Sequence, residues 1–226
     1  MSTPDGSRDS AASPDQEGSE PAGADALKAF LGDAYEPMQQ FAQLLIAHGE
    51  ERGLIGPREI PRLWDRHLVN CSLLASVLPQ SGRIADVGSG AGLPGIVIAI
   101  MRPNARVLLV ESMVKRCEWL GEVSDRLGLS NVEVLNGRAE EYAGALEADA
   151  VTARAVAALD KLTRWAMPLV HVGGEMVVLK GASAEQEIES AQKALRKFAA
   201  RDAAVQELTG PPGYSDARIV RATRGR

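Results

Sequence analysis

The chain has 226 residues, enough for one α/β domain of ordinary size and a short extension. Of its net charge of −5, residues 1–24 carry −4, because five acids there face one arginine, and this leaves −1 for the rest of the chain. A nearly neutral body excludes binding to nucleic acid through a global positive field, so any such contact must come from local patches.

Cysteine usage and hydropathy indicate the compartment. Cys71 and Cys117 lie far apart in amphipathic helical patterns, which suits two small buried thiols in a reducing compartment. We expect no metal site, because the two cysteines and three histidines show no ligand spacing. No signal-peptide pattern and no apolar run of membrane-spanning length is present. A cytoplasmic protein without membrane contact is therefore predicted.

The N-terminal third is predicted to be helical after a polar tail. Residues 1–24 have almost nothing to bury, so we expect a disordered acidic tail there. From residue 26 to about 48 apolar residues recur at helical spacing, with Pro37 marking a break or a helix start. The loop 53–61 leads to a second helix over 62–78. Residues 25–80 are thus expected to form a helical extension.

After residue 82, short apolar runs alternate with helical stretches. The expected strands are 83–87, 106–110, 132–135, 149–153 and 175–179, and the helices between and after them are 93–102, 113–127, 157–170 and 183–200. Such alternation is typical of βαβ units and a parallel sheet covered on both faces. Strands 203–208 and 217–223 flank a Pro/Gly loop and predict a final antiparallel hairpin. Residues 81–226 are therefore expected to form one domain around a mostly parallel seven-stranded sheet.

A glycine-rich loop follows the first of these strands. The segment reads Asp86-Val-Gly-Ser-Gly-Ala-Gly-Leu-Pro-Gly95. Glycines 88, 90 and 92 permit positive φ and let the backbone approach a ligand closely, and Pro94 suits the start of the next helix. The first β–α crevice of an open α/β sheet is where ligands bind. The segment therefore predicts a nucleotide-cofactor loop.

Acids near this loop bear on which cofactor it binds. Residues 90–95 also match G-x-G-x-x-G, so a dinucleotide must be considered. Asp86 would repel a pyrophosphate but attract the ammonium of a methionine-type ligand, unless it only caps the helix. Glu111, ending the second strand, can accept both ribose hydroxyls of an adenosine, or be a solvated acid. The turn 136–141 borders an adenine in this fold, although its acids also suit a helix start. Together these features favour S-adenosylmethionine over NAD.

The same loop resembles the cofactor segment of the ribosomal RNA small subunit methyltransferase G family, also called glucose-inhibited division protein B. Further blocks resemble that family's in the same order: Arg66-His67-Leu68, Glu111–Arg116, Trp119-Leu120, Asn131-Val132, Gly137–Glu141, Thr152–Ala155 and Leu179–Gly181. The resemblance spans about residues 62–182. It implies a Rossmann-like class I S-adenosylmethionine-dependent methyltransferase acting on N7 of a guanine in the decoding-region loop of bacterial 16S rRNA. Loss of that activity is associated with low-level streptomycin resistance in the family.

The resemblance also assigns roles to positions of this chain. Ala139 and Glu140 match the family's adenine-side pair, and Arg154 matches an arginine near the methyl donor and acceptor. With the loop and its acids, the expected cofactor contacts are Asp86, Gly88, Gly90, Leu93, Glu111, Ala139, Glu140 and Arg154.

Substrate contacts are expected at Arg66, His67 and Lys180, although a packed His67 and a solvated Lys180 are open alternatives. The chain departs from the family at Asn70, where Asp is expected, and at Val156, where an aromatic residue is expected. Arginines 58, 62 and 66, and arginines 218, 221, 224 and 226, form two clusters that are either RNA contacts or ordinary solvated faces. We expect 16S rRNA to be met in a small subunit or precursor particle, where shape adds to charge.

The implied methyl transfer does not require a general base. Guanine N7 is an unprotonated lone pair at neutral pH, so methyl transfer needs no general base and depends on positioning and electrostatics. Arg154 cannot act as a base, and we expect it to position the acceptor through a phosphate or the guanine edge. Two alternatives stay open from the sequence: a methyltransferase of a small molecule or protein, and an NAD-dependent oxidoreductase or nucleotide-binding regulator.

Overall fold

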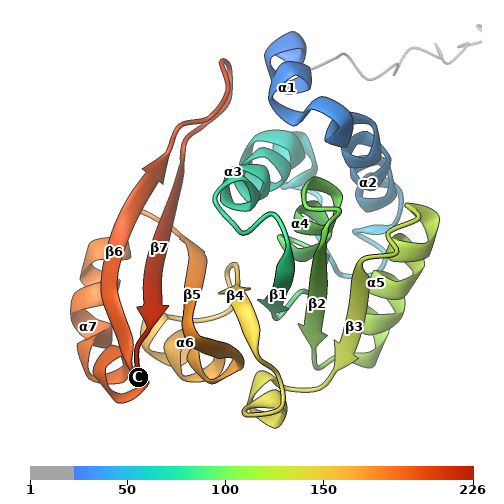
Figure 1. Ribbon diagram of the computed structural model, residues 1–226. Helices are drawn as coiled ribbons and strands as arrows, with labels where there is room; N and C mark the ends of the chain where they lie inside the picture. Colours follow the sequence, from blue (N-terminus) through green and yellow to red (C-terminus); the bar gives the residue numbers. More distant parts are fainter. Residues whose placement is uncertain (1–22) are drawn as a thin grey trace, which may run out of the picture.

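A computed structural model describes residues 23–226 of the chain (Figure 1). Of the acidic tail expected to be disordered over residues 1–24, residues 1–22 lie outside the described residues, whereas the expectation was wrong for Ala24, which begins α1 (Ala24–Leu31). One seven-stranded sheet forms the centre, in the order β3-β2-β1-β4-β5-β7-β6. The strands are β1 (Gly82–Val87), β2 (Ala105–Glu111), β3 (Val132–Asn136), β4 (Ala148–Thr152), β5 (Val170–Lys180), β6 (Ala200–Leu208) and β7 (Ala217–Arg224).

Strand direction confirms the predicted sheet. β1 to β5 are mutually parallel, with Asp86 of β1 in register with Leu109 of β2 and Thr152 of β4. β7 pairs antiparallel with both β5 and β6, so the predicted hairpin closes the sheet and places β7 inside β6. The chain order of the strands reverses between β1 and β4. Ligands bind at such a reversal, outside the carboxyl ends of the strands.

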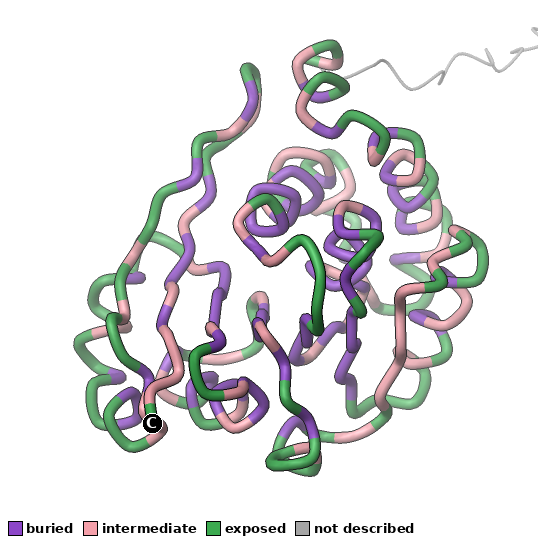
Figure 2. The backbone as a smooth tube through the Cα atoms, viewed as in Figure 1, coloured by how far each residue is buried: buried purple, intermediate pink, exposed green. Residues whose placement is uncertain are grey.

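Helices cover both faces of the sheet (Figure 2). One face packs against the N-terminal helices together with α3 (Asn70–Ser76), α4 (Gly95–Met101) and α5 (Val114–Arg126), and it includes Ile84 of β1. The other face packs against α6 (Leu159–Ala166) and α7 (Ala184–Lys197), and it includes the next residue, Ala85. Burial of adjacent strand residues on opposite faces explains the continuous apolar runs in the sequence.

The N-terminal helices differ in detail from the prediction. The break falls at Gly32 (φ +54°), between α1 (Ala24–Leu31) and α2 (Tyr35–His48), while Pro37 lies in the first turn of α2. The helix expected over 62–78 is a 3-10 turn (Ile60–Arg62), a π-helix (Leu63–Val69) and then α3. Periodicity of apolar residues does not separate these helix types, so the π-helix was not predicted.

Two further boundaries shift for identifiable reasons. The helix expected over 157–170 ends at Ala166 and continues as a 3-10 turn (Met167–Leu169), because Pro168 has no N–H for the helical ladder. The helix expected from residue 93 begins at Gly95, after Pro94. The loop between β6 and β7 reaches back to the π-helix, where the backbone N–H and hydroxyl of Ser215 donate to Asp65 at 2.7 and 3.0 Å.

Among the described residues, no helix is both long and apolar enough to cross a membrane. Residues 23–226 contain no group of three or more His, Cys, Asp or Glu side chains arranged to hold a metal ion. Cys71 is buried as expected, whereas the expectation of a buried Cys117 was wrong. Cys117 is half-buried at the start of α5, where its thiol donates to the Glu111 carbonyl at 3.2 Å.

Candidate active site

The candidate site is a cleft at the carboxyl ends of β1, β2 and β4. Two adjoining cavities of about 240 and 490 Å³ share Gly88, Glu111, Ser112 and Val156 as lining residues. The larger of the two is within the size range typical of small-molecule and cofactor sites. The cleft therefore lies at the strand-order reversal, where the sequence placed the cofactor loop.

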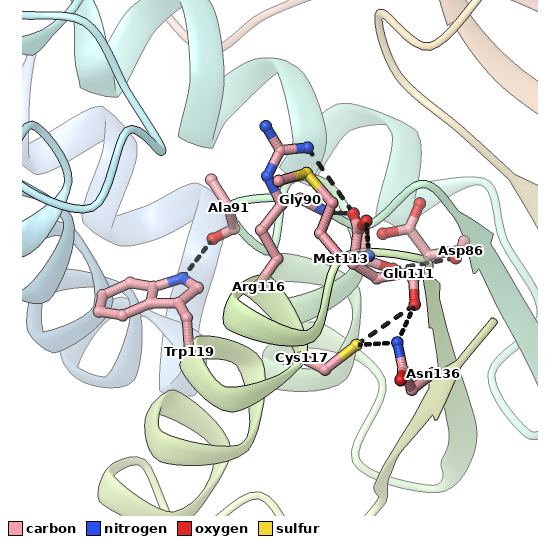
Figure 3. A network of polar contacts seen from close by, with 10 residues as sticks. Asp86, Gly90, Ala91, Glu111, Met113, Arg116, Cys117, Trp119 and Asn136 are labelled. Atoms are coloured by element: carbon pink, nitrogen blue, oxygen red, sulfur yellow. Dashed lines mark hydrogen bonds and ion pairs between the residues drawn. The ribbon is translucent and has the colours of Figure 1, made fainter. Parts of the chain in front are cut away.

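The loop 88–95 lets its backbone form one wall of the cleft. Gly88 has a φ of +73°, and a Cβ at this position would lie 2.9 Å from Cγ2 of Val156. Trp119 of α5 holds the loop from behind, because its indole N–H donates to the Ala91 carbonyl at 3.1 Å (Figure 3). Gly90 and Leu93, two of the residues predicted to contact the cofactor, line the larger cavity.

Glu111 lies at the centre of the cleft and is 4% exposed (Figure 3). Its Oε2 accepts a hydrogen bond from the Gly90 N–H at 3.0 Å, and its Oε1 accepts one from the Met113 N–H at 2.9 Å. Nη1 of Arg116 lies 3.9 Å from Oε2 of Glu111 and forms a weak ion pair with it. A carboxylate lining both cavities can accept the two ribose hydroxyls of an adenosine, and it is not the solvated acid that was the alternative.

Asp86 is completely buried behind the loop. Its Oδ2 accepts the Gly95 N–H at 3.0 Å, which is the helix-capping contact considered as the alternative. Its Oδ1 has no hydrogen-bond partner among residues 23–226. Burial raises the pKa of this carboxyl to about 7, with Glu111 as a further, smaller cause. Asp86 lines none of the three cavities at this edge of the sheet, so the structure places it behind the loop and not on the wall of the cleft.

The smaller cavity is bounded by the turn after β3. Ala139 and Glu140 begin the 3-10 helix η4 (Ala139–Tyr142) and line this cavity, next to Gly137 and Arg138. Trp165 of α6 also lines this cavity and was not singled out from the sequence. With few aromatic residues in the chain, the signal that could have identified it was its place on the helix after β4.

A third cavity of about 590 Å³ adjoins the cleft across Arg154 and Val156. It is lined by the expected substrate residues Arg66, His67 and Lys180, and also by Asn70. The structure therefore brings the three predicted substrate residues together beside the cofactor cleft. Val156 lines all three cavities and is 37% exposed. Asn70 and Val156, two positions where the sequence departs from the family, thus lie at the site.

Arg154 is held by a chain of hydrogen bonds. Its guanidinium donates to Nδ1 of His67, and Nε2 of His67 is 2.8 Å from Oε2 of Glu59. Burial, and then the charge of Arg154, lowers the pKa of His67. Hydrogen bonding to His67 lowers the pKa of Glu59. Glu59 was not identified as a site residue from the sequence, where it is one acid in a loop.

Lys180 is not a solvated strand end. Its side chain is 8% exposed, and Nζ donates to Oε2 of Glu187 at 2.7 Å and to the Ala157 carbonyl at 2.9 Å. The same Glu187 oxygen accepts the Leu159 N–H at 2.9 Å. Lys180 therefore fixes the segment 155–159 that follows Arg154, while lining the third cavity.

The two arginine clusters differ. Arg218 pairs with Glu185 and Glu207, and Arg221 and Arg224 donate to backbone carbonyls, so the C-terminal cluster is largely engaged within the fold. Arginines 58, 62 and 66 are exposed and form no ion pair within residues 23–226. Of the two clusters, this one is unpaired in the described part of the chain, and its Arg66 lines the third cavity.

The strand order, the glycine loop after β1 and the acids ending β1 and β2 define a class I S-adenosylmethionine-dependent methyltransferase. Sequence comparison then gives the particular family. The profile of the family described as rRNA small subunit methyltransferase G matches residues 34–215, and the chain belongs to this family. The predicted fold class and cofactor are thereby confirmed, and the nicotinamide-dependent alternative is excluded.

Curated relatives carry the same family name. A ribosomal RNA small subunit methyltransferase G of Beutenbergia cavernae is 50% identical over 184 residues, which cover 81% of this chain and 87% of the relative. One from Thermobifida fusca is 45% identical over 200 residues, covering 88% and 84% of the two chains. Membership therefore extends over most of the length of both proteins.

Solved structures show the same fold at low identity. An S-adenosylmethionine-dependent O-methyltransferase of Thermotoga maritima superposes with a TM-score of 0.56 at 18% identity, covering 74% of this chain and 70% of that one. A predicted O-methyltransferase of Agrobacterium tumefaciens gives a TM-score of 0.55 at 23% identity, covering 70% and 81%. These likenesses support the methyltransferase fold alone.

Proposed function

We propose that this enzyme transfers the methyl group of S-adenosylmethionine to N7 of a guanine in the decoding-region loop of 16S rRNA. The observation that carries the proposal is the position of Arg154, which lines both the cofactor cleft and the third cavity. A cationic donor on the wall between two cavities can orient an acceptor toward the methyl group of a bound cofactor.

The residues of the cleft fit the cofactor by chemical type. Glu111 would accept the ribose hydroxyls, Gly88, Gly90 and Leu93 would contact the ligand along the loop, and Ala139 and Glu140 would border the adenine. Asp86, with its unpartnered oxygen, would attract the ammonium group. S-adenosylmethionine supplies the electrophilic methyl group on its sulfonium sulfur.

Within the described residues, the histidine, lysine and arginine side chains that line the third cavity offer no free base, which suits guanine N7. His67 has both ring nitrogens engaged, Lys180 is paired with Glu187, and Arg154 is permanently charged. An acceptor that had to lose a proton would need a general base there, whereas N7 presents a lone pair. Because catalysis then depends on positioning, Arg154 would bind the guanine edge or a neighbouring phosphate, and Arg66 would be a further contact.

The substrate in cells is proposed to be 16S rRNA within a small subunit or precursor particle in the cytoplasm. Support comes from the near-neutral charge of the chain after residue 24 and from the exposed arginine cluster 58, 62 and 66, of which Arg66 lines the third cavity. Such a protein gains affinity from the shape of folded RNA and of assembled proteins as well as from charge.

The test offers methyl-labelled S-adenosylmethionine with unmethylated small-subunit RNA, intact subunits and free nucleosides. Label in RNA, mapped by digestion to N7-methylguanine at one decoding-region position, supports the proposal. Transfer to a small molecule or protein alone, or to another atom of the base, contradicts it. Calorimetric titration with S-adenosylmethionine and NAD in parallel checks the cofactor, and heat from NAD alone would overturn that assignment.

A further inference from the structure

We infer that Glu59 is a positioning residue for methyl transfer, acting through His67 on the guanidinium of Arg154. This inference rests on the proposed function for its kinetic consequence, whereas its structural part can be measured on the protein without RNA. It assigns a role to an acid in the loop before the π-helix, and it accounts for the burial of a histidine beside Arg154.

The three side chains come from separate parts of the chain. Glu59 precedes the 3-10 turn at Ile60–Arg62, His67 lies in the π-helix, and Arg154 follows β4. His67 is 8% exposed, and all three residues line the third cavity. Glu59 is therefore separated from Arg154 by one imidazole ring, which contacts both.

Hydrogen-bond chemistry fixes the direction of this chain. A guanidinium can only donate, so Nδ1 of His67 must be unprotonated to accept from Arg154. In a neutral imidazole the proton is then on Nε2, which donates to Glu59 over 2.8 Å. A carboxylate accepts but does not donate, so Glu59 selects the tautomer that receives Arg154. The opposite tautomer would direct an N–H at the guanidinium.

The charges around His67 agree with a neutral ring. Arg154 faces it from the loop after β4, Arg66 lies on its own helix, and Glu59 faces it from the preceding loop. The Arg154 guanidinium also contacts the sulfur of Cys71, a buried thiol, at 3.5 Å. Burial and the two arginines favour the neutral ring, while Glu59 alone opposes them. Protonation of His67 would remove the acceptor for Arg154 and place two cations in contact.

The tautomer can be read directly because the chain contains only three histidines. Nitrogen-15 NMR of histidine-labelled protein should show His67 as the Nε2–H tautomer at pH 7.5, assigned by the signal lost in His67→Asn. Glu59→Ala should shift His67 toward a tautomer mixture, while Glu51→Gln, in the same loop, should not. An Nδ1–H tautomer in the unmodified protein, or no change in Glu59→Ala, overturns the inference.

Kinetics test the effect on Arg154 at saturating S-adenosylmethionine. Glu59→Gln should lower kcat for RNA methylation by about 10- to 100-fold, as expected for a misplaced catalytic group, with calorimetric affinity for the cofactor unchanged. Because Glu59 raises the pKa of His67, the acid limb of the kcat profile should move to lower pH in this variant. A fall in stability without these changes would indicate a merely structural role and contradict the inference.

A double variant isolates the route through His67. The amide oxygen of Asn can accept a hydrogen bond at the position of Nδ1, so His67→Asn should retain part of kcat. Because Asn does not titrate, the acid limb of the kcat–pH profile should be lost in this variant. Adding Glu59→Gln to His67→Asn should then cost little more, because Glu59 acts through the ring. Multiplicative losses would overturn the inference. Failure of the unmodified enzyme to methylate RNA would instead contradict the proposed function, and the NMR result would still decide the role of Glu59.

Discussion

Asp86 and Gly95 are joined by a hydrogen bond in which the Gly95 N–H donates to Oδ2 of Asp86 over 3.0 Å. A Cβ at position 95 would lie 2.6 Å from the same oxygen, so this approach requires glycine. The second oxygen, Oδ1, is buried without a partner in the described part of the chain. One oxygen of this carboxyl thus anchors the first turn of α4, and the other is buried without a hydrogen-bond partner behind the cofactor loop. Such an unpartnered polar atom lowers stability and is found in native proteins mainly at functional sites.

This burial predicts a pH-dependent stability. The folded pKa of Asp86 is raised from 3.8 to about 7, so the folded state binds the proton more tightly than the unfolded chain. The contribution is therefore favourable at low pH and is lost as pH rises from about 4 to about 7, amounting to on the order of 4 kcal/mol. In Asp86→Asn that loss should be absent. Denaturant unfolding of both proteins between pH 4 and 8 checks this, and equal pH dependence would contradict it.

Gly88 and Val156 predict a coupled pair of variants. Gly88→Ala places a side chain at φ +73° and a Cβ 2.9 Å from Val156, so the loop or Val156 must shift. We expect affinity for S-adenosylmethionine to fall roughly tenfold, equivalent to about 1.4 kcal/mol. Adding Val156→Ala should relieve the contact and restore part of the affinity. The restoration should be incomplete, because the strain of a positive φ at position 88 remains. Gly121→Ala on α5, where a Cβ meets no described atom within 4 Å, is the matched control. Unchanged affinity in Gly88→Ala would contradict the close approach.

Much of the fold was predictable because it depends on local patterns. Every predicted strand exists. The five parallel strands are short apolar runs between helical stretches, and the two antiparallel strands flank a Pro/Gly loop. The cofactor loop was predictable for the same reason: glycine spacing and the acids of adjacent strand ends are local in sequence. The π-helix was not predicted, because its hydrogen bonds, rather than the period of its apolar residues, distinguish it.

Contacts between distant segments were harder to predict. The environment of Arg154 depends on His67, 87 positions earlier, and on Glu59 beyond it. Lys180 was considered as a solvated strand end because its partner Glu187 belongs to the next helix. The C-terminal arginines resembled a basic cluster until their carboxylate and carbonyl partners on other elements were known. Charges in sequence show where cations are, but not which of them are already paired.

The pair Lys180–Glu187 predicts a stability contrast. Glu187→Ala would leave a largely buried ammonium with one acceptor and remove the acceptor of the Leu159 N–H. We expect a loss of about 1–3 kcal/mol in the free energy of unfolding. Glu133→Ala breaks the exposed pair with Arg106, whose side chain is 61% exposed, and should cost below about 1 kcal/mol. Chemical denaturation of both variants measures the contrast, and similar losses would show that the Glu187 network is not a buried anchor.

Arg154→Ala should separate transfer from cofactor binding. Removing the cation from the wall between the two cavities should lower kcat by about 100- to 1000-fold, the usual cost of a lost electrostatic contact to reacting groups. Binding of S-adenosylmethionine should stay measurable by calorimetry, because Glu111 and the glycine loop are intact. Arg164→Ala, on the exposed side of α6, controls for loss of positive charge. Normal methylation by Arg154→Ala would remove this residue from the mechanism.

Activity should depend on the assembly state of the RNA. Apart from residues 1–22, the chain is close to neutral, and the exposed arginines 58, 62 and 66, of which Arg66 lines the third cavity, form no ion pair within residues 23–226. Three phosphate contacts give weak binding to a short hairpin at physiological salt, so a folded particle must supply shape-dependent contacts. We therefore expect faster methylation of small subunits or precursor particles than of a naked decoding-region hairpin at equal concentration and salt. Replacing the three arginines by alanine should slow transfer to both RNAs and flatten its salt dependence, while equal rates on hairpin and particle with the unmodified enzyme would refute the expectation.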